Sequence, residues 1–363
     1  MKVLYITNSL KTGGAEKLIT ETIPLLNNSK KIFVDILLLC GSNEPFLEKL
    51  ASLNCCKIIR LSQNSIYNPL LIFRIIPYLK KYNIVHVHLF PSLYFVCLAK
   101  IISLSKVKII YTEHSTTNKR RNNICFKLLD KLFYSIYDRI VTISPEVDAN
   151  IKSHLGFNPQ KFIEIPNGVN ISAINQERSM SKVKIAPGIG RESFVILQVS
   201  SFRYPKDQKT VIRALPYLSL NTVLVLVGTG PLLDECKKLV VDLKLENRVF
   251  FLGLRNDVFT LIKSVDIVVL SSHYEGLSLA CLEGMASGKP FIASDVPGLG
   301  NVVRDAGILF AKNDYIALSK EIKRLQTEPH HYELTVNKCQ KRAEEYDINK
   351  NVSKLTELYL SFT

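Results

Sequence analysis

Short runs of apolar residues recur along the whole chain, separated by helix-length segments that mix apolar and polar positions. The runs are rich in Val, Ile and Leu and alternate little, which is typical of parallel strands covered on both faces. In the first half they are VLYIT, IFVDILLL, KIIRL, IVHVH, VKIIYT and RIVTIS; in the second half they are FVILQVS, TVLVLVG, RVFFLG, DIVVLSS, KPFIAS and AGILF. Two such series predict two doubly wound α/β domains with parallel sheets rather than one large sheet.

The border between the two predicted domains lies near PNGVN, residues 166–170. We therefore expect a first domain over residues 1–170 and a second over 171–349. Residues 171–193 are polar and lack a sustained period, so we interpret them as a linker or an irregular surface segment. In open parallel sheets ligands bind beyond the carboxyl ends of the strands, and we expect a ligand cleft between the two domains, lined by loops that follow strands.

The composition is that of a soluble globular protein, with 47% apolar and 22% charged residues. The N-terminus lacks the long apolar stretch of a secretory signal, and we expect a cytoplasmic protein. Residues 82–99 carry no charge, but His86, His88 and Pro91 interrupt them, so we interpret them as a strand, a turn and a buried helix and expect no transmembrane helix. The eight cysteines show no metal-ligand spacing, and we expect buried reduced thiols and no zinc.

The formal net charge of +15 indicates an anionic partner, such as a nucleic acid, an anionic membrane surface or a phosphate-rich substrate. Bulky apolar residues such as Ile124, Leu128 and Leu132 are mixed at helical spacing with basic ones. This pattern suits a helix lying on a membrane and equally a helix packing its apolar side onto its own domain, and the sequence leaves both open. The basic residues of this segment are Lys119, Arg120, Arg121, Lys127 and Lys131.

Two features of the first half fall directly after predicted strands. Gly13 and Gly14 separate the first strand from a helix, where backbone N–H groups can approach an anion, although a simple tight turn explains the pair nearly as well. The spacing is not G-x-G-x-x-G, which argues against a dinucleotide-dependent enzyme. His114 follows the strand VKIIYT and can donate to a substrate hydroxyl or phosphate, with a structural capping role as the alternative. Of His86 and His88, inside a strand, at least one is interpreted as a core histidine.

In the second half, basic residues and glycines follow the first two strands. Arg203 and Lys206 lie in the loop after FVILQVS and suit a diphosphate, which Arg binds bidentately and Lys as a point charge. Gly228 follows TVLVLVG and permits a close backbone approach to a ligand, or forms a plain turn.

The most specific stretch is SSHYEGLSLACLEGMASGKPFIASDVPGL, which begins at residue 271. Glu275 follows a strand, and Glu283 comes eight positions later on a predicted helix. Carboxylates are good acceptors for the vicinal hydroxyls of sugars and ribose. Between them the predicted helix start at Gly276, Leu277 and Ser278 offers N–H groups to phosphate or sugar oxygens. No third acid lies at useful spacing, so we expect no metal.

Taken together, these motifs resemble the retaining glycosyltransferases of the GT-B fold, family four. The resemblance covers GGAE, VHVH, TEH, PNGVN, RYPKD, VGTGP and FLGLRNDV, and it is most specific at the Glu-x7-Glu pair and GMASGKPFIASDVPG. It implies two Rossmann-like domains facing a central cleft, the first on the acceptor side and the second binding a nucleotide sugar. It also implies a C-terminal helix, at about residues 350–363, that crosses back to the first domain.

The resemblance implies roles for the acidic and basic residues. Glu275 would contact the donor sugar, and Glu283 would hold the ribose of the nucleotide. Lys206 would neutralise the departing diphosphate together with Arg203. The family more often has this Arg about two positions earlier, where this chain has Ser201.

The resemblance implies further roles for residues of both domains. The backbone at Gly14 would touch the phosphate, His114 would lie beside the sugar, and the base would sit near Arg255 and Val258. It also implies transfer with retention, no metal or other cofactor, and, by likeness to enzymes of surface-polysaccharide assembly, a saccharide or lipid-linked acceptor.

Three other functions remain open at this point. A nucleotide-sugar epimerase would use the same cleft without an acceptor. The charge alone suits a nucleic-acid-binding protein, although no basic aromatic RNA motif or helix-turn-helix pattern is apparent. An inactive sugar-binding subunit is the third.

Overall fold

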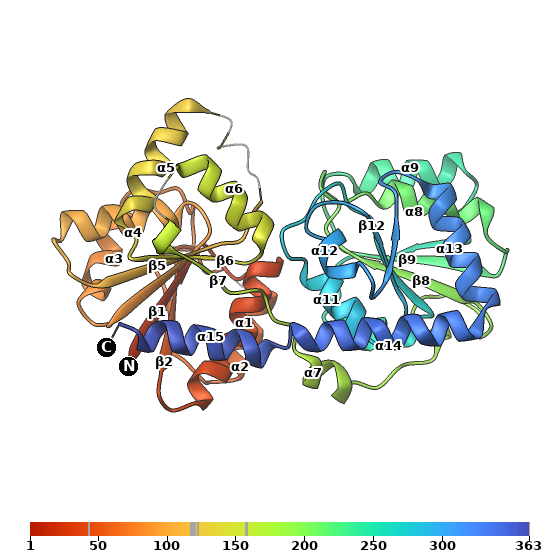
Figure 1. Cartoon of the computed structure of the whole chain (residues 1–363), viewed down its shortest axis with the longest axis horizontal. Coiled ribbons are helices and arrows are strands. Elements are labelled where there is room, and N and C mark those ends of the chain that lie inside the picture. The colour runs from red at the N-terminus through yellow and green to blue at the C-terminus, as the bar shows by residue number, and fades with distance from the viewer. Residues whose placement is uncertain (43, 117–120, 122, 157–158, 363) are drawn as a thin grey trace. The chain divides into compact units, whose positions relative to one another are not determined.

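The structure is a computed structural model, and it describes all residues except 43, 117–120, 122, 157–158 and 363. The chain divides into two compact units (Figure 1). The first unit comprises residues 1–168 and 348–363, and the second comprises residues 169–347. The border therefore falls two residues before the expected position at residue 170.

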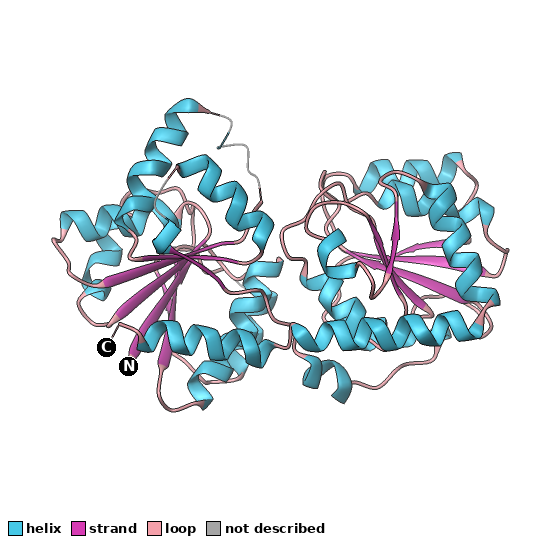
Figure 2. Cartoon of the chain, in the orientation of Figure 1, coloured by secondary structure: helices cyan, strands magenta, loops and turns pink. Residues whose placement is uncertain are grey.

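The first unit contains a parallel sheet with the strand order β3-β2-β1-β4-β5-β6-β7. Its strands are β1 Lys2–Thr7, β2 Phe33–Leu38, β3 Ile58–Arg60, β4 Ile84–His88, β5 Lys108–Glu113, β6 Arg139–Thr142 and β7 Phe162–Glu164. Its helices are α1 Gly14–Asn28, α2 Pro45–Ser52, α3 Leu71–Leu79, α4 Ser92–Ile102, α5 Ile124–Ile136, α6 Pro145–Leu155, the short 3-10 helix η2 Pro159–Lys161 and α15 Ile348–Leu360. Helices cover both faces of this sheet (Figure 2).

Strand β1 shows why its residues form a buried parallel strand. Its side chains alternate between the two faces of the sheet, and both faces are apolar. Val3 and Tyr5 pack in one cluster with residues of α1, α2 and α15, whereas Leu4 and Ile6 pack in the other with residues of α3, α4 and α6.

The second unit repeats this architecture with the strand order β10-β9-β8-β11-β12-β13. Its strands are β8 Phe194–Val199, β9 Thr222–Val227, β10 Val249–Phe251, β11 Ile267–Leu270, β12 Phe291–Ser294 and β13 Ile308–Phe310. Its helices are α7 Ile171–Gln176, α8 Gln208–Ala214, α9 Leu233–Asp242, α10 Val258–Ser264, α11 Leu279–Ala286, α12 Gly300–Val303, α13 Tyr315–Thr327 and α14 Pro329–Glu345, with the short 3-10 helices η3 Lys182–Lys184 and η4 Leu215–Tyr217. The sequence thus predicted two doubly wound α/β domains, and the structure confirms both.

Each sheet reverses its strand order beside its first strand. In the first unit β1 pairs with β2 on one side and with β4 on the other; in the second unit β8 pairs with β9 and with β11. At such a switch point the loops after the two central strands diverge to opposite faces of the sheet, which opens a binding position at their carboxyl ends. These two loop pairs are therefore where each unit is built to hold a ligand.

The interpretation of residues 171–193 as a linker or irregular surface segment is wrong. The segment contains α7 and η3, and α7 packs against α10 and α11. Ile185 and Ile189 are buried although their spacing shows no regular period. Burial of these side chains makes the segment part of the second unit.

Helix α15 belongs to the first unit, although α14, which precedes it in the chain, belongs to the second. Leu355, Leu358 and Tyr359 of α15 lie in the same apolar cluster as Val3 and Tyr5 of β1. The C-terminal helix expected near residues 350–363 thus contributes to the core of the N-terminal unit.

Among the described residues, no helix is long and apolar enough to cross a membrane. Residues 82–99 form the end of the loop before β4, β4 itself, a turn and most of α4, which confirms the predicted strand, turn and helix. The cysteines are free thiols, but Cys125 on α5 is exposed and Cys55 and Cys56 are half-buried, which corrects the expectation that they are buried.

Candidate active site

The loops after β8 and β11 are bound to each other at the switch point of the second unit. Lys206 and Ser272 form an antiparallel bridge, and the backbone N–H of His273 donates to the carbonyl oxygen of Pro205 over 2.8 Å. The backbone N–H of Asp207 donates to the carbonyl oxygen of Ser271 over 3.1 Å. These backbone bonds fix the positions from which Lys206 and Glu275 project.

The structure brings Lys206 and Glu275 into direct contact. The Lys206 ammonium donates to Oε1 of Glu275, and both side chains are largely buried. The hydroxyl of Ser272 donates to the same oxygen over 2.6 Å. A carboxylate held in this way is ready to accept from sugar hydroxyls, and the ammonium beside it provides positive charge for a phosphate.

Two residues of the loop after β12 support the backbone of Glu275. The N–H of Glu275 donates to the carbonyl oxygen of Pro297 over 3.0 Å. Gly298 has φ of +83°, and a Cβ atom there would lie 2.3 Å from the carbonyl oxygens of both Glu275 and Gly276. Only glycine fits both the left-handed backbone and the close approach. This support was not identified from the sequence, although glycine in the VPGL motif was a signal for it.

Glu283 and Val258, expected near the ribose and the base, line one pocket. Val199 and Ala280 also line this pocket. Glu283 lies on α11 and is largely buried, with an exposed fraction of 5%. A carboxylate in a mostly apolar pocket is the arrangement that fixes the orientation of a small ligand.

The helix start between the two glutamates is α11, which begins at Leu279. Ser278 is its N-cap, and the Ser278 side chain makes no capping bond to a described residue. Leu277 is buried, so its side chain contributes to the core. The carbonyl oxygen of Gly276 is one of the two that lie close to Gly298, as described above.

The remaining residues of this unit that were predicted to bind the donor are Arg203, Arg255 and Gly228. Arg203 is exposed. Arg255 makes two hydrogen bonds to the Asp257 carboxylate, 2.8 and 2.6 Å long, which raise the pKa of Arg255 and lower that of Asp257. Gly228 has φ of +136°, and a Cβ atom there would lie 2.1 Å from the carbonyl oxygen of Ser200. Gly228 therefore lets the loop after β9 lie against the loop after β8.

In the first unit the glycine pair begins α1, with Gly13 as its N-cap and Gly14 as its first residue. A Cβ atom on Gly13 would lie 2.3 Å from Oε2 of Glu16. Burial raises the pKa of the Glu16 carboxyl, with the nearby Glu44 adding to the effect. The first turn of α1 thus already holds an acidic side chain, which was not predicted from the sequence.

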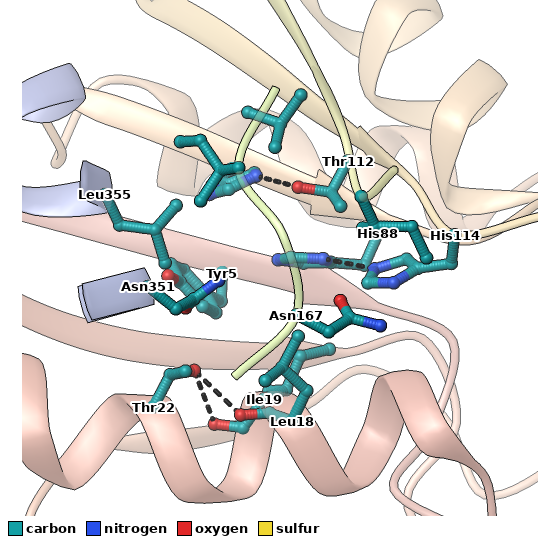
Figure 3. A pocket seen from close by; sticks show the side chains of 14 residues that line it. Tyr5, Leu18, Ile19, Thr22, His88, Thr112, His114, Asn167, Asn351 and Leu355 are labelled. Atoms are coloured by element: carbon teal, nitrogen blue, oxygen red, sulfur yellow. Dashed lines mark hydrogen bonds between the residues drawn. The ribbon is translucent and has the colours of Figure 1, made fainter. Parts of the chain in front are cut away.

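His114 contacts His88 (Figure 3), and His88 contacts His86, so three imidazoles follow one another. Its Nε2 is 3.0 Å from Nδ1 of His88, and the His88 ring stacks on that of His86 at 4.4 Å between centroids. His86 is fully paired, as a core histidine should be: Nδ1 contacts the Tyr359 hydroxyl and Nε2 the Thr112 hydroxyl, both at 2.6 Å.

Burial keeps all three imidazoles uncharged at neutral pH. Desolvation lowers the pKa of His86 to about 3 and that of His114 to about 4. The pKa of His88 is also well below its usual value, because of burial first and of the two neighbouring rings second. His114 is therefore suited to hydrogen bonding rather than to acting as a cation.

Within the described residues, no group of three or more His, Cys, Asp or Glu side chains is arranged to hold a metal ion. Lys206 places a positive charge directly beside Glu275 at this site.

Comparisons with known proteins agree with this architecture. The family described as "Glycosyltransferase Family 4" matches residues 12–173, and the family described as "Glycosyl transferases group 1" matches residues 180–353. Together the two matches cover nearly the whole chain.

Two bacterial relatives span most of the chain. One, from Escherichia coli, is a "UDP-Gal:alpha-D-GlcNAc-diphosphoundecaprenol alpha-1,3-galactosyltransferase"; it is 26% identical, and the match covers 99% of this chain and 97% of that protein. The other, from Campylobacter jejuni, is an "N-acetylgalactosamine-N,N'-diacetylbacillosaminyl-diphospho-undecaprenol 4-alpha-N-acetylgalactosaminyltransferase" that is 25% identical, with 79% of each chain covered.

The fold is similar to that of HepE from Anabaena, solved in complex with UDP and glucose. The TM-score is 0.87 at 19% sequence identity, and the match covers 99% of this chain and 100% of that one. At this level of identity the likeness concerns the fold alone.

Proposed function

The chain is a glycosyltransferase of the family 4 type, and from this premise we propose that it transfers a hexose from a nucleoside diphosphate sugar to a lipid-linked saccharide with retention of configuration. The observation that carries the proposal is the contact between Lys206 and Glu275 at the switch point of the second unit. The two relatives described above, both named for diphosphoundecaprenol-linked substrates, support the lipid-linked acceptor.

In the proposed complex each residue of the pair serves one part of the donor. Glu275 accepts hydrogen bonds from hydroxyls of the sugar, and Lys206 exchanges its contact with Glu275 for the diphosphate. Glu283 accepts from the ribose, and Val258 lies against the base, since both line one pocket. Arg203, in the same loop as Lys206 and exposed, reaches the diphosphate from the solvent side.

The proposed reaction is a front-side displacement. The bond between the anomeric carbon and the diphosphate oxygen breaks, the acceptor oxygen bonds to the same face of that carbon, and the acceptor proton goes to the leaving phosphate. Lys206 and the N-terminus of α11 stabilise the charge that grows on the diphosphate, which is electrostatic preorganisation. Because these groups supply the positive charge, we propose that transfer needs no metal ion.

For the first unit, the proposal gives roles to His114 and to the start of α1, as the family resemblance implies. His114, uncharged at neutral pH, donates a hydrogen bond to the donor sugar. The backbone at Gly13 and Gly14 approaches the phosphate at the α1 N-terminus.

The test compares purified variants in transfer from a panel of nucleotide sugars to a lipid-diphosphate saccharide. Glu275→Ala and Lys206→Ala should each lose nearly all turnover while remaining folded. A matched control is Lys209→Ala, which breaks the more exposed ion pair between Lys209 of α8 and Glu235 of the neighbouring helix α9. Normal turnover in either site variant would remove the assignment. Donor consumption without an acceptor, and without release of nucleotide, would favour the epimerase instead.

We further propose that the enzyme acts at an anionic membrane surface through α5. Four large apolar residues of this helix are exposed, by 73% at Ile124, 65% at Leu128, 41% at Leu129 and 57% at Leu132. The opposite side of the helix packs inward through Asp130, Phe133 and Tyr134. The helix therefore carries apolar residues on both sides, and within the described part of the chain only one of these sides is buried.

The charge around α5 supports an anionic lipid as the partner. Residues 61–137 contain eleven Lys and Arg but only two acidic residues, Glu113 and Asp130. Both acids are buried, and they pair with Arg121 at 2.9 Å and His154 at 3.0 Å respectively. Arg121 thus serves the interior, which corrects its assignment to the membrane-facing set. Lys119 and Arg120, also assigned to that set, lie outside the described residues.

Co-sedimentation with vesicles tests this proposal. Wild type should bind phosphatidylglycerol vesicles and not phosphatidylcholine vesicles, and binding should fall with salt. Leu128→Gln with Leu132→Gln, and separately Lys127→Ser with Lys131→Ser, should weaken it. The control is Leu220→Gln, which changes an 86% exposed leucine of the second unit. Binding that is unchanged in both double variants would refute the role of α5.

A further inference from the structure

The contact between His88 and His114 has a chemical consequence for the proposed role of His114. His88 is the last residue of β4, and His114 follows the last residue of β5. Because the two strands pair with His88 opposite Thr112, the two imidazoles meet at the same end of the sheet. Their nitrogens, His88 Nδ1 and His114 Nε2, are 3.0 Å apart (Figure 3).

A hydrogen bond between two uncharged imidazoles contains one proton, so the tautomer of one ring determines that of the other. A neutral imidazole has one N–H donor and one acceptor nitrogen. If His88 donates from Nδ1, then His114 accepts at Nε2 and carries its own proton on Nδ1. If instead His114 donates, its Nδ1 carries only a lone pair and it cannot donate to a substrate from that atom.

The surroundings of His88 decide between the two senses. Its Nε2 is buried and has no hydrogen-bond partner among the described residues. If His114 donated, His88 would carry its proton on Nε2, and a buried N–H would be left unpaired. If His88 donates, only an acceptor nitrogen, its Nε2, is left unpaired. Protein interiors tolerate an unpaired acceptor better than an unpaired donor.

The rest of the row keeps the His88 ring in place. The His86 ring, stacked against it, is fixed at both nitrogens by the hydroxyls of Tyr359 and Thr112. Tyr359 belongs to α15 and also bonds the Tyr5 hydroxyl of β1 over 2.6 Å. The Tyr5 ring in turn contacts His88 at 5.0 Å between centroids. Because the His88 ring has so little freedom to move, it is a suitable donor for fixing the tautomer of His114.

We propose that His88 is a positioning residue that donates its Nδ1 proton to His114 Nε2 and so holds His114 as the Nδ1–H tautomer, ready to donate to an oxygen of the donor sugar. His88 itself does not touch the substrate. The final clause about the sugar rests on the proposed function, whereas the tautomer does not.

The tautomer is measured directly by 15N NMR of the histidine rings in the full-length protein, with assignments from single substitutions of the seven histidines. Wild-type His114 should show the Nδ1–H pattern. In His88→Phe, which keeps a ring but has no N–H, the pattern should change. His88→Asn places an amide donor near the Nδ1 position and should retain the pattern. A wild-type His114 with its proton on Nε2 would overturn the proposal, whether or not the protein transfers sugars.

Kinetics test whether His88 acts through His114. His88→Phe should lower kcat by about tenfold to hundredfold, the usual effect of removing a group that orients a functional residue, and His88→Asn should restore most of it. In a His114→Ala background the same substitution should cost less than twofold, because its effect has already been removed. Full additivity of the two losses would overturn the positioning role. Should His88→Phe fail to fold, His88→Asn and the wild-type spectrum still decide the tautomer.

Discussion

Substitution of Gly298 by alanine provides a sharp test of how the fold holds Glu275. An alanine there meets two obstacles, the backbone φ of +83° and the 2.3 Å approach of its Cβ to the carbonyl oxygens of Glu275 and Gly276. The first costs about 1–2 kcal/mol for a residue other than glycine. The second requires the Glu275 loop to move by about 1 Å, and a misplacement of that size costs roughly a hundredfold in rate.

The chain offers a matched control for this variant. Gly253 also has a left-handed φ, +64°, but nothing lies within 4 Å of the Cβ that an alanine would add. Gly253→Ala should therefore show the backbone cost alone, about 1–2 kcal/mol in the free energy of unfolding, with turnover unchanged. Gly298→Ala should show that cost and in addition the loss of turnover.

Urea unfolding measures the first quantity, and steady-state transfer at saturating donor measures the second. If Gly298→Ala turns over within twofold of Gly253→Ala, the loop after β12 does not position Glu275 for the reaction. Loss of turnover in both variants would show that backbone strain anywhere in the unit is enough to stop the reaction. This result would equally refute the role of Gly298 in positioning Glu275.

Further predictions concern the donor, the histidine row and the metal. Glu283→Gln should raise KM for the donor more than it lowers kcat, because Glu283 holds the ribose and not the reacting sugar; an equal loss in kcat alone would contradict this. The free energy of unfolding should fall as the pH drops below about 6.5, the pKa of a histidine in the unfolded chain. In the folded protein the pKa is about 3 for His86 and about 4 for His114, so at pH 5.5 the loss should be about 1 kcal/mol for each. His86→Gln should reduce that slope in urea unfolding, whereas His330→Gln, at an exposed position, should not. Tyr359→Phe, which leaves His86 Nδ1 without its partner, should cost about 1–3 kcal/mol in the same assay, with the exposed Tyr217→Phe as its control. Dialysis against EDTA should leave turnover unchanged, and recovery only with added Mg2+ would refute the proposal of transfer without a metal.

The parts of this fold that were predictable from the sequence are those determined by the pattern of apolar and polar residues over a few neighbouring positions. Strands covered on both faces must be apolar throughout, so all the apolar runs that were read as strands contain strands. Residues 171–193 were misinterpreted because α7 has only six residues, and the burial of Ile185 depends on distant partners that leave no period in the sequence.

The candidate site was predictable only as separate loops. Lys206 and Glu275 each follow a strand, but their contact depends on β8 lying beside β11, a pairing that skips β9 and β10. The His88–His114 contact likewise depends on the register of β4 against β5. The Arg121–Glu113 ion pair was missed because a basic residue in a basic segment gives no sign that it points inward.

The most direct test of the central claim, that Lys206 and Glu275 together bind a sugar diphosphate, is thermal unfolding of the purified protein in a series of nucleotide sugars. A ligand at 100 times its Kd stabilises the native state by about 2.7 kcal/mol, which is easily seen as a higher Tm. We expect one nucleotide sugar to raise the Tm of wild type and of Lys209→Ala, and to have little effect on Lys206→Ala and Glu275→Ala. An equal rise in all four proteins, or no rise in wild type with any nucleotide sugar, would contradict the claim.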